Sequence, residues 1–196
     1  MTGDAGLRIK NALVSVSDKS RLEELVSYLD KHKVSIFSTG GTAKFIESLG
    51  INVTQISEIT NFPEIMDGRV KTLNPFIYGG ILNRSGIDDH VQKEHKMVNL
   101  DLMVINLYPF EETISKNNIN ESDAIENIDI GGPSMIRASA KNFYHKAILT
   151  DPEDYESFIN ELKNNDCLIS ETSRRDLAIK AFRKTAMYDS AIHNYF

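Results

Sequence analysis

Residues 34–50 read VSIFSTGGTAKFIESLG, and this stretch decides the class of fold. The run 34–37 is short and apolar, as in a buried strand, and 43–50 has helical apolar spacing up to Gly50. Two glycines and three hydroxyl side chains lie between them. A strand that passes through a glycine-rich turn into a helix indicates an α/β unit with a place for an anion.

The remainder of the chain continues this alternation. Apolar runs predict further strands over 12–16, 51–56, 102–107 and 147–150, and periodic segments predict helices over 22–29, 122–128, from 133 onward, from 151 onward and over 172–195. The pattern SRLE at 20–23 predicts a capping box. Strands that alternate with helices predict a three-layer α/β fold with a mainly parallel central sheet. Residues 57–80 are irregular but too apolar for disorder, which is typical of a functional loop.

Composition excludes several classes of protein. The 196 residues carry a net charge of -6 without a basic block, which argues against nucleic acid as a partner. A single cysteine excludes a disulfide framework and argues against a zinc cluster. No apolar run reaches the ~20 residues of a membrane span, and no secretory signal is recognisable, so we expect a cytoplasmic protein without membrane contact. We expect residues 1–10 to be a disordered lead-in and 11–196 to form one domain.

The glycine-rich turn predicts a phosphate site. Backbone N–H groups at a helix start are unpaired and favour an anion, and glycine lets a ligand approach them. Taken alone, the turn is explained equally well by a helix cap, and it lacks the P-loop pattern. The stretch SVSDK at 15–19 follows the neighbouring strand, and its Lys19 supplies a full positive charge. Together the two stretches indicate a phosphate monoester or a nucleotide 5′-phosphate.

A second group of motifs points to acid–base chemistry. GRVKTL at 68–73 places two cations on one side of an extended segment, NLYPF at 106–110 ends a strand with polar groups, and DIGG at 129–132 sets a carboxyl group before two glycines. Each has a plainer explanation: a solvated loop, aromatic packing, a helix cap. Lys141 on the following helix is ordinarily an exposed lysine. The five histidines form no metal or triad pattern.

Taken together, SVSDK, STGGTAK, GRVKTL, NLYPF, IDIGGPSMIRASAKN and the closing LAIKAF, TAMYDSAI and YF resemble one family from about residue 11 to 196. This is the IMP cyclohydrolase domain of the bifunctional AICAR transformylase/IMP cyclohydrolase. The resemblance implies a methylglyoxal synthase-like fold. It implies closure of the purine six-membered ring, in which FAICAR loses water to give IMP.

The resemblance also implies roles residue by residue. Phosphate-binding positions are Ser15, Ser17, Lys19, Ser38, Thr39, Gly40, Gly41 and Thr42. Positions around the base are Arg69, Thr72, Asn106, Ile130, Gly131 and Gly132. The implied catalytic group is Lys71, Tyr108, Asp129 and Lys141. Lys71 and Tyr108 would stabilise charge on the amide oxygen, while Asp129 and Lys141 would move protons.

No metal or cofactor is implied for ring closure; 10-formyltetrahydrofolate serves only the family's transformylase domain, which is absent from this chain. The full-length family member is a homodimer, so we expect this chain to be a monomer or a weak dimer. The family pattern has histidines where this chain has Asn74, Tyr78 and Phe143. Two alternatives stay open: a methylglyoxal synthase-like enzyme that eliminates phosphate, and a non-catalytic module that senses a nucleotide.

Overall fold

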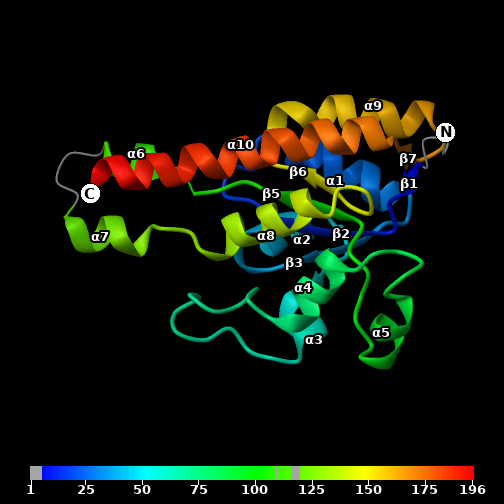
Figure 1. Cartoon of the computed structure of the whole chain (residues 1–196), viewed down its shortest axis with the longest axis horizontal. Coiled ribbons are helices and arrows are strands. Elements are labelled where there is room, and N and C mark those ends of the chain that lie inside the picture. Colours follow the sequence, from blue (N-terminus) through cyan, green and yellow to red (C-terminus); the bar gives the residue numbers. More distant parts are fainter. Residues whose placement is uncertain (1–5, 109, 116–119) are drawn as a thin grey trace.

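A computed structural model describes residues 6–108, 110–115 and 120–196. Five parallel strands form the central sheet in the order β4-β3-β2-β5-β6 (Figure 1). Their bounds are β2 (Asn11–Ser15), β3 (Ser35–Ser38), β4 (Thr54–Gln55), β5 (Leu102–Ile105) and β6 (Ala147–Leu149). The middle strand, β2, pairs with β3 on one side and with β5 on the other. The predicted α/β class and parallel sheet are confirmed.

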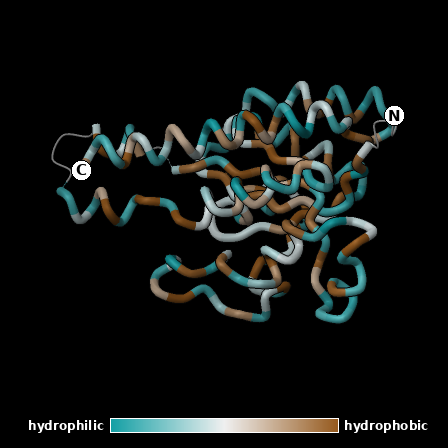
Figure 2. Tube along the Cα trace, viewed as in Figure 1, coloured by the Kyte–Doolittle hydropathy of each residue, from teal (hydrophilic) through white to brown (hydrophobic). Residues whose placement is uncertain are grey.

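Helices cover both faces of this sheet, because alternate strand residues point to opposite sides. Val14 lies in a core with α1 (Leu22–Lys31), α2 (Gly40–Ser48) and α9 (Tyr155–Asn164). Leu13 lies in a second core with α4 (Pro75–Leu82), α8 (Gly131–Lys141) and α10 (Glu171–Tyr195). Figure 2 shows the hydrophobic residues concentrated between these layers. The arrangement is a three-layer sandwich with two separate apolar cores.

The long helix α10 packs along the second core and contacts several of its elements. Its 25 residues span about 37 Å, and it packs against α8, β6 and the short α6 (Phe110–Ile114). The other short helices are α3 (Ile56–Thr60), α5 (Asp89–Glu94), α7 (Glu121–Glu126) and the 3₁₀ turn η1 (Pro152–Asp154). Over the described ranges, no helix combines the length and apolar character that crossing a bilayer requires.

The expected disordered lead-in is wrong for residues 7–10. β1 (Leu7–Arg8) pairs antiparallel with β7 (Leu168–Ile169), and Ile9 is buried in the first core. The cause is a tertiary contact, because Leu7 and Arg8 pair with a strand about 160 residues later in the sequence. No local sequence pattern predicts such a pairing. Residues 1–5 lie outside the described residues.

Three local expectations also need correction. The strand predicted over 51–56 is only β4, at 54–55. The capping box at 20–23 does not form, because the Asp18 carboxylate accepts the Ser20 N–H at 2.8 Å and Arg21 takes the N-cap position. Most of helix α4 lies inside the stretch 57–80 that we expected to be irregular. Its glycines are explained by packing, since a Cβ on Gly80 would lie 2.4 Å from the Val98 carbonyl oxygen.

Candidate functional site

The sheet topology brings the predicted motifs to one edge. β2, β3 and β5 are adjacent and parallel, so the turns that follow them lie together at the carboxyl edge of the sheet. These turns hold residues 16–19, 39–42 and 106–108. The chain leaves β2 toward β3 but leaves β5 toward β6, and ligands of open α/β sheets bind at such a reversal.

The glycine turn starts helix α2 at the glycines themselves. Thr39 is the extended N-cap, and Gly40 has φ +56, a left-handed conformation that favours glycine. Open space surrounds both Gly40 and Gly41, since a Cβ added to either residue would meet no atom within 4 Å. The first backbone N–H groups of α2 therefore face an approachable surface, as an anion site requires.

Two of the hydroxyls predicted to bind phosphate are already committed to the fold. The buried Ser38 hydroxyl donates to the Val14 carbonyl oxygen at 2.7 Å. The Thr42 hydroxyl donates to the Val16 carbonyl oxygen at 2.9 Å and accepts the Val16 N–H at 3.1 Å. Both side chains join the turn to β2. The exposed glycines and half-buried Thr39 are left as the approachable donors of this segment.

The loop after β2 is held by Asn106. The Asn106 Oδ1 accepts the N–H groups of Ser17 and Asp18 at 2.7 and 3.0 Å, and Nδ2 donates to the Asp18 carbonyl oxygen at 2.8 Å. The Ser17 hydroxyl donates to the Leu107 carbonyl oxygen at 2.8 Å. Ser15 and Lys19 are half-buried beside this loop, and the Lys19 Nζ lies 3.4 Å from the Ser17 carbonyl oxygen. The amide of Asn106, expected to read the base, instead positions this loop.

A second turn, at 129–132, carries the candidate acid. The Asp129 Oδ1 accepts the Gly132 N–H at 2.8 Å, which caps α8. Burial is the main influence and raises the pKa of the Asp129 carboxyl; the Gly132 hydrogen bond and the charge of Lys71 oppose it and lower the pKa. A carboxyl group with a raised pKa is suited to exchanging protons near neutral pH.

Both glycines of DIGG allow close packing around the acid. A Cβ on Gly131 would lie 2.8 Å from the Thr72 Oγ1, so this glycine lets residues 71–72 approach the turn. A Cβ on Gly132 would lie 2.3 Å from the Asp129 Oδ2 and 2.8 Å from the Leu107 Cδ2. The structure therefore packs Thr72, the residue after Lys71, against the 129–132 turn.

Other predicted residues lie at the rim. Tyr108 and Ile130 are 56% and 61% exposed. Arg69 is exposed and pairs with Glu126 of α7, a neighbour that the sequence did not predict. Lys141 is exposed at the last residue of α8, while Asp129 precedes the first. Eleven helical residues separate these ends by about 16 Å, so the structure does not bring Lys141 to Asp129.

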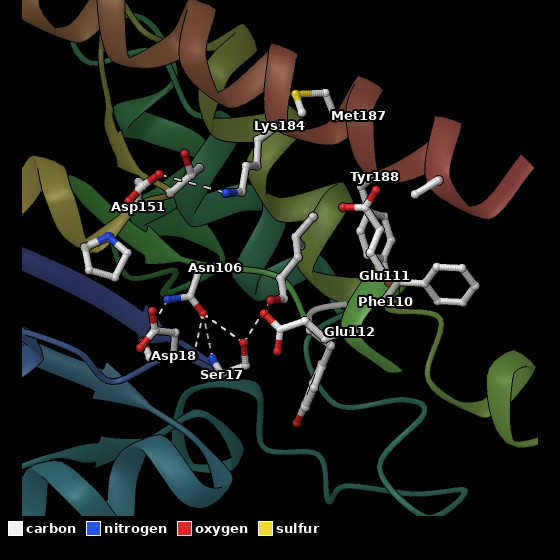
Figure 3. A pocket seen from close by; sticks show the side chains of 15 residues that line it. Ser17, Asp18, Asn106, Phe110, Glu111, Glu112, Asp151, Lys184, Met187 and Tyr188 are labelled. Carbon is white, nitrogen blue, oxygen red and sulfur yellow. Dashed lines mark hydrogen bonds and ion pairs between the residues drawn. The ribbon is translucent and has the colours of Figure 1, made fainter. Parts of the chain in front are cut away.

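A cavity of about 580 Å³ opens beside these turns, between the ends of β2 and β5 and helix α10 (Figure 3). Its wall includes Ser17, Asn106 and Tyr108 from the predicted set. Sequence reasoning missed Tyr188 and Lys184 of α10 and Asp151, which lies 3.9 Å from the Lys184 Nζ. The Tyr188 oxygen accepts the Asp129 N–H at 2.8 Å. The only feature of the sequence that could have pointed to Tyr188 is its position in TAMYDSAI, one of the motifs that carry the family resemblance.

The three positions that depart from the family pattern have structural partners. The Asn74 side chain caps α4 by accepting the Phe76 N–H at 2.9 Å, ahead of Pro75. Tyr78 contacts Ser134 through its hydroxyl, and Phe143 stacks on Tyr144. Within the described residues, no three His, Cys, Asp or Glu side chains gather as metal ligands.

Two family models match successive parts of the chain. Residues 21–134 match the family described as MGS-like domain, and residues 139–196 match the family described as AICARFT/IMPCHase bienzyme. The sequence is 49% identical over 189 residues to the "Bifunctional purine biosynthesis protein PurH" of Xanthomonas euvesicatoria pv. vesicatoria. That alignment covers 96% of this chain and 36% of the relative, so the chain spans about a third of its length.

A solved structure agrees with these matches. The protein in "Crystal structure of ForH" superposes with a TM-score of 0.83 at 32% sequence identity. The match covers 94% of this chain and 97% of that one. At that coverage the shared fold includes the central sheet, at whose carboxyl edge the candidate site lies.

Proposed function

We propose that this chain, which belongs to the MGS-like domain family, is an IMP cyclohydrolase domain of the PurH type, because residues 139–196 match the bienzyme family and the chain is 49% identical to a PurH protein. Its substrate is FAICAR, and its product is IMP. The observation that carries the proposal is the packing of Thr72, next to Lys71 in the chain, against the Asp129 turn, beside an approachable helix start at the same sheet edge. The start of α2 suits a ribotide phosphate, and the Asp129 turn suits proton transfer.

We assign phosphate binding to the N–H groups that begin α2, with Thr39 and Lys19 beside them. A dianion there is stabilised by unpaired N–H groups and the helix dipole. Ser15 approaches from the end of β2, while Ser17, Ser38, Thr42 and Asn106 act indirectly, because their hydrogen bonds fix the turns. The Lys19 charge matters because the chain as a whole is acidic.

Ring closure joins the carboxamide nitrogen of FAICAR to its formyl carbon. As the C–N bond forms, the nitrogen loses a proton and the formyl oxygen becomes a hydroxyl. The hydroxyl then leaves with a proton as water, and a second nitrogen proton is released to restore the aromatic ring. The reaction is intramolecular, so holding the two groups in contact supplies much of the rate. Oxidation states do not change, and we propose that no metal or cofactor takes part.

We assign the proton transfers to Asp129. Its carboxylate takes the proton from the attacking nitrogen, and its acid form returns one to the departing hydroxyl. Lys71 and Tyr108 stabilise negative charge on the carboxamide oxygen. A placed acid or base contributes about 10²–10⁴-fold in rate. Lys141 is proposed only from the resemblance, since the structure supplies no contact between it and this group.

The match to the MGS-like domain family also suggests the strongest alternative function. An enzyme that eliminates phosphate from dihydroxyacetone phosphate, as methylglyoxal synthase does, would use the same sheet edge. The match of 139–196 to the bienzyme favours ring closure instead. Purified chain is assayed with FAICAR and separately with dihydroxyacetone phosphate. Conversion of FAICAR alone supports the proposal, whereas phosphate release from the triose alone contradicts it. IMP binding without either conversion favours a sensing module.

Two further expectations are proposals of the same kind. We propose a cytoplasmic location, because FAICAR is a charged metabolite of purine synthesis. We also propose that this chain is a monomer or a weak dimer while the full-length relatives form homodimers. Sedimentation velocity over a wide concentration range checks the second proposal, and a concentration-independent dimer would contradict it.

A further inference from the structure

Two tyrosines from different helices hold the turn that carries Asp129. On one side, the Asp129 N–H donates to the Tyr188 oxygen of α10 at 2.8 Å. On the other side, the Tyr78 hydroxyl of α4 lies 2.5 Å from the Ser134 Oγ, and Ser134 is 3.0 Å from the Gly131 carbonyl oxygen. The turn is therefore anchored from both flanks.

The directions of these hydrogen bonds follow from proton counting. The Ser134 hydroxyl donates its single proton to Gly131, so Tyr78 must donate to Ser134. Tyr188 accepts from the Asp129 N–H and keeps its own proton. Among the hydrogen bonds between described residues, none takes up that proton. Tyr188 is only 8% exposed, and it lines the cavity (Figure 3). Tyr108 belongs to the same lining.

Packing alone does not require these hydroxyls. α8 and α10 already meet through apolar residues such as Met135, Ile136 and Ala181, and a phenylalanine ring would fill the space of Tyr188 equally well. Both hydroxyls reach the one turn that carries the acid. Burial raises the pKa of both phenols, so they stay protonated at neutral pH.

We propose that Tyr78 and Tyr188 are positioning residues that set the place of the Asp129 carboxyl for proton transfer. This inference rests on the proposed cyclohydrolase function. Neither residue needs to touch the reacting atoms in this role. Loss of either anchor lets the turn shift, and a displacement of about 1 Å at a catalytic group can cost up to ~10²-fold in rate.

The test combines amide exchange with kinetics. In Tyr188→Phe, we expect hydrogen exchange of the Asp129 amide, followed by NMR, to accelerate about 2- to 13-fold, as loss of one net hydrogen bond implies. We expect kcat for FAICAR to fall about 10- to 100-fold while the Kd for IMP changes less than about threefold. Tyr195→Phe is the matched control: it lies on the same helix, packs edge-on against Phe110 and should change neither quantity.

The second anchor has its own variants. Ser134→Ala removes the same link as Tyr78→Phe, so each should lower kcat about 3- to 30-fold, and the double variant should lose no more than the worse single one. Ser134→Ala keeps the test decisive if Tyr78→Phe folds poorly.

Unchanged amide exchange in Tyr188→Phe, or faster exchange with normal kcat, would overturn the proposal for Tyr188. Full additivity of Tyr78→Phe and Ser134→Ala would overturn it for Tyr78. A wild-type chain that binds IMP but converts no FAICAR would instead overturn the proposed function, and the exchange rate would still decide whether Tyr188 anchors the turn.

Discussion

Replacing Gly132 with alanine should cripple turnover without unfolding the protein. The added Cβ would lie 2.3 Å from the Asp129 Oδ2 and 2.8 Å from the Leu107 Cδ2. Both distances are shorter than van der Waals contact, so the carboxyl oxygen must retreat by about 1 Å. The Gly132 N–H also holds the other carboxyl oxygen at 2.8 Å, so the whole group must rotate or tilt.

The expected magnitude follows from that displacement. A shift of about 1 Å at a catalytic group costs up to ~10²-fold, so we expect kcat to fall about 10- to 100-fold. The free energy of unfolding should fall by about 2 kcal/mol or less, because alanine gains up to about 1 kcal/mol in a helix while overpacking costs about 1–3 kcal/mol. FAICAR turnover is followed by the ultraviolet change on ring closure, and unfolding is followed in urea.

Gly79→Ala is a matched control on another helix. Its Cβ would lie 2.4 Å from the Met97 sulfur, a comparable clash, but the methionine side chain can rotate away. We expect normal turnover from it. Adding Gly132→Ala to Asp129→Asn should cause no further loss if the alanine acts through the carboxyl. Wild-type turnover by Gly132→Ala would refute the role assigned to Asp129.

Asn106→Ala should lower the free energy of unfolding by about 2 kcal/mol and Tm by about 4–8 °C, because it leaves the Ser17 and Asp18 N–H groups without their acceptor. Calorimetry against Asn160→Ala, at an exposed position of α9, checks this, and an unchanged Tm would contradict the anchoring role. Asp129→Asn should abolish turnover yet unfold no earlier than wild type at pH 7. Burial raises the pKa of Asp129 in the folded state, so its ionised form opposes folding above that pKa. The extra free energy of unfolding of Asp129→Asn over wild type should fade as pH falls through the folded-state pKa of Asp129, and it should vanish below about pH 3.9. Urea titrations of both proteins from about pH 3 to 8 test this. A stability difference that grows in acid would contradict it. Glu126→Gln, which weakens an exposed ion pair with Arg69, should cost less than about 1 kcal/mol, and a larger loss in urea would show that the pair holds the 61–74 loop.

Local patterns predicted the elements whose signals are local. The four strands β2, β3, β5 and β6 are short apolar runs, and the turn at 38–42 carries glycine at the positive φ that it needs. The motifs also indicated which turns gather at the sheet edge, because parallel strands place their carboxyl ends together.

What the sequence did not reveal depends on distant partners. β1 exists only because β7 pairs with it, and α4 tolerates two glycines only because residues 97–100 pack closely against them. Asn106 was expected beside the base, but its amide oxygen and one of its amide protons hold the loop after β2. Lys141 belongs to the same motif as Asp129, yet a helix separates them. Sequence spacing shows neither which hydrogen bonds are already taken nor how far apart one motif's ends lie.

The most direct measurement is FAICAR turnover by the purified 196-residue chain in excess EDTA, compared with Lys71→Met and Asp129→Asn. We predict that wild type forms IMP without added metal or cofactor. We also predict that each variant loses at least about 100-fold in kcat while still binding IMP through the start of α2. Variants that turn over FAICAR as fast as wild type would contradict the assignment of Lys71 and Asp129 to the chemistry.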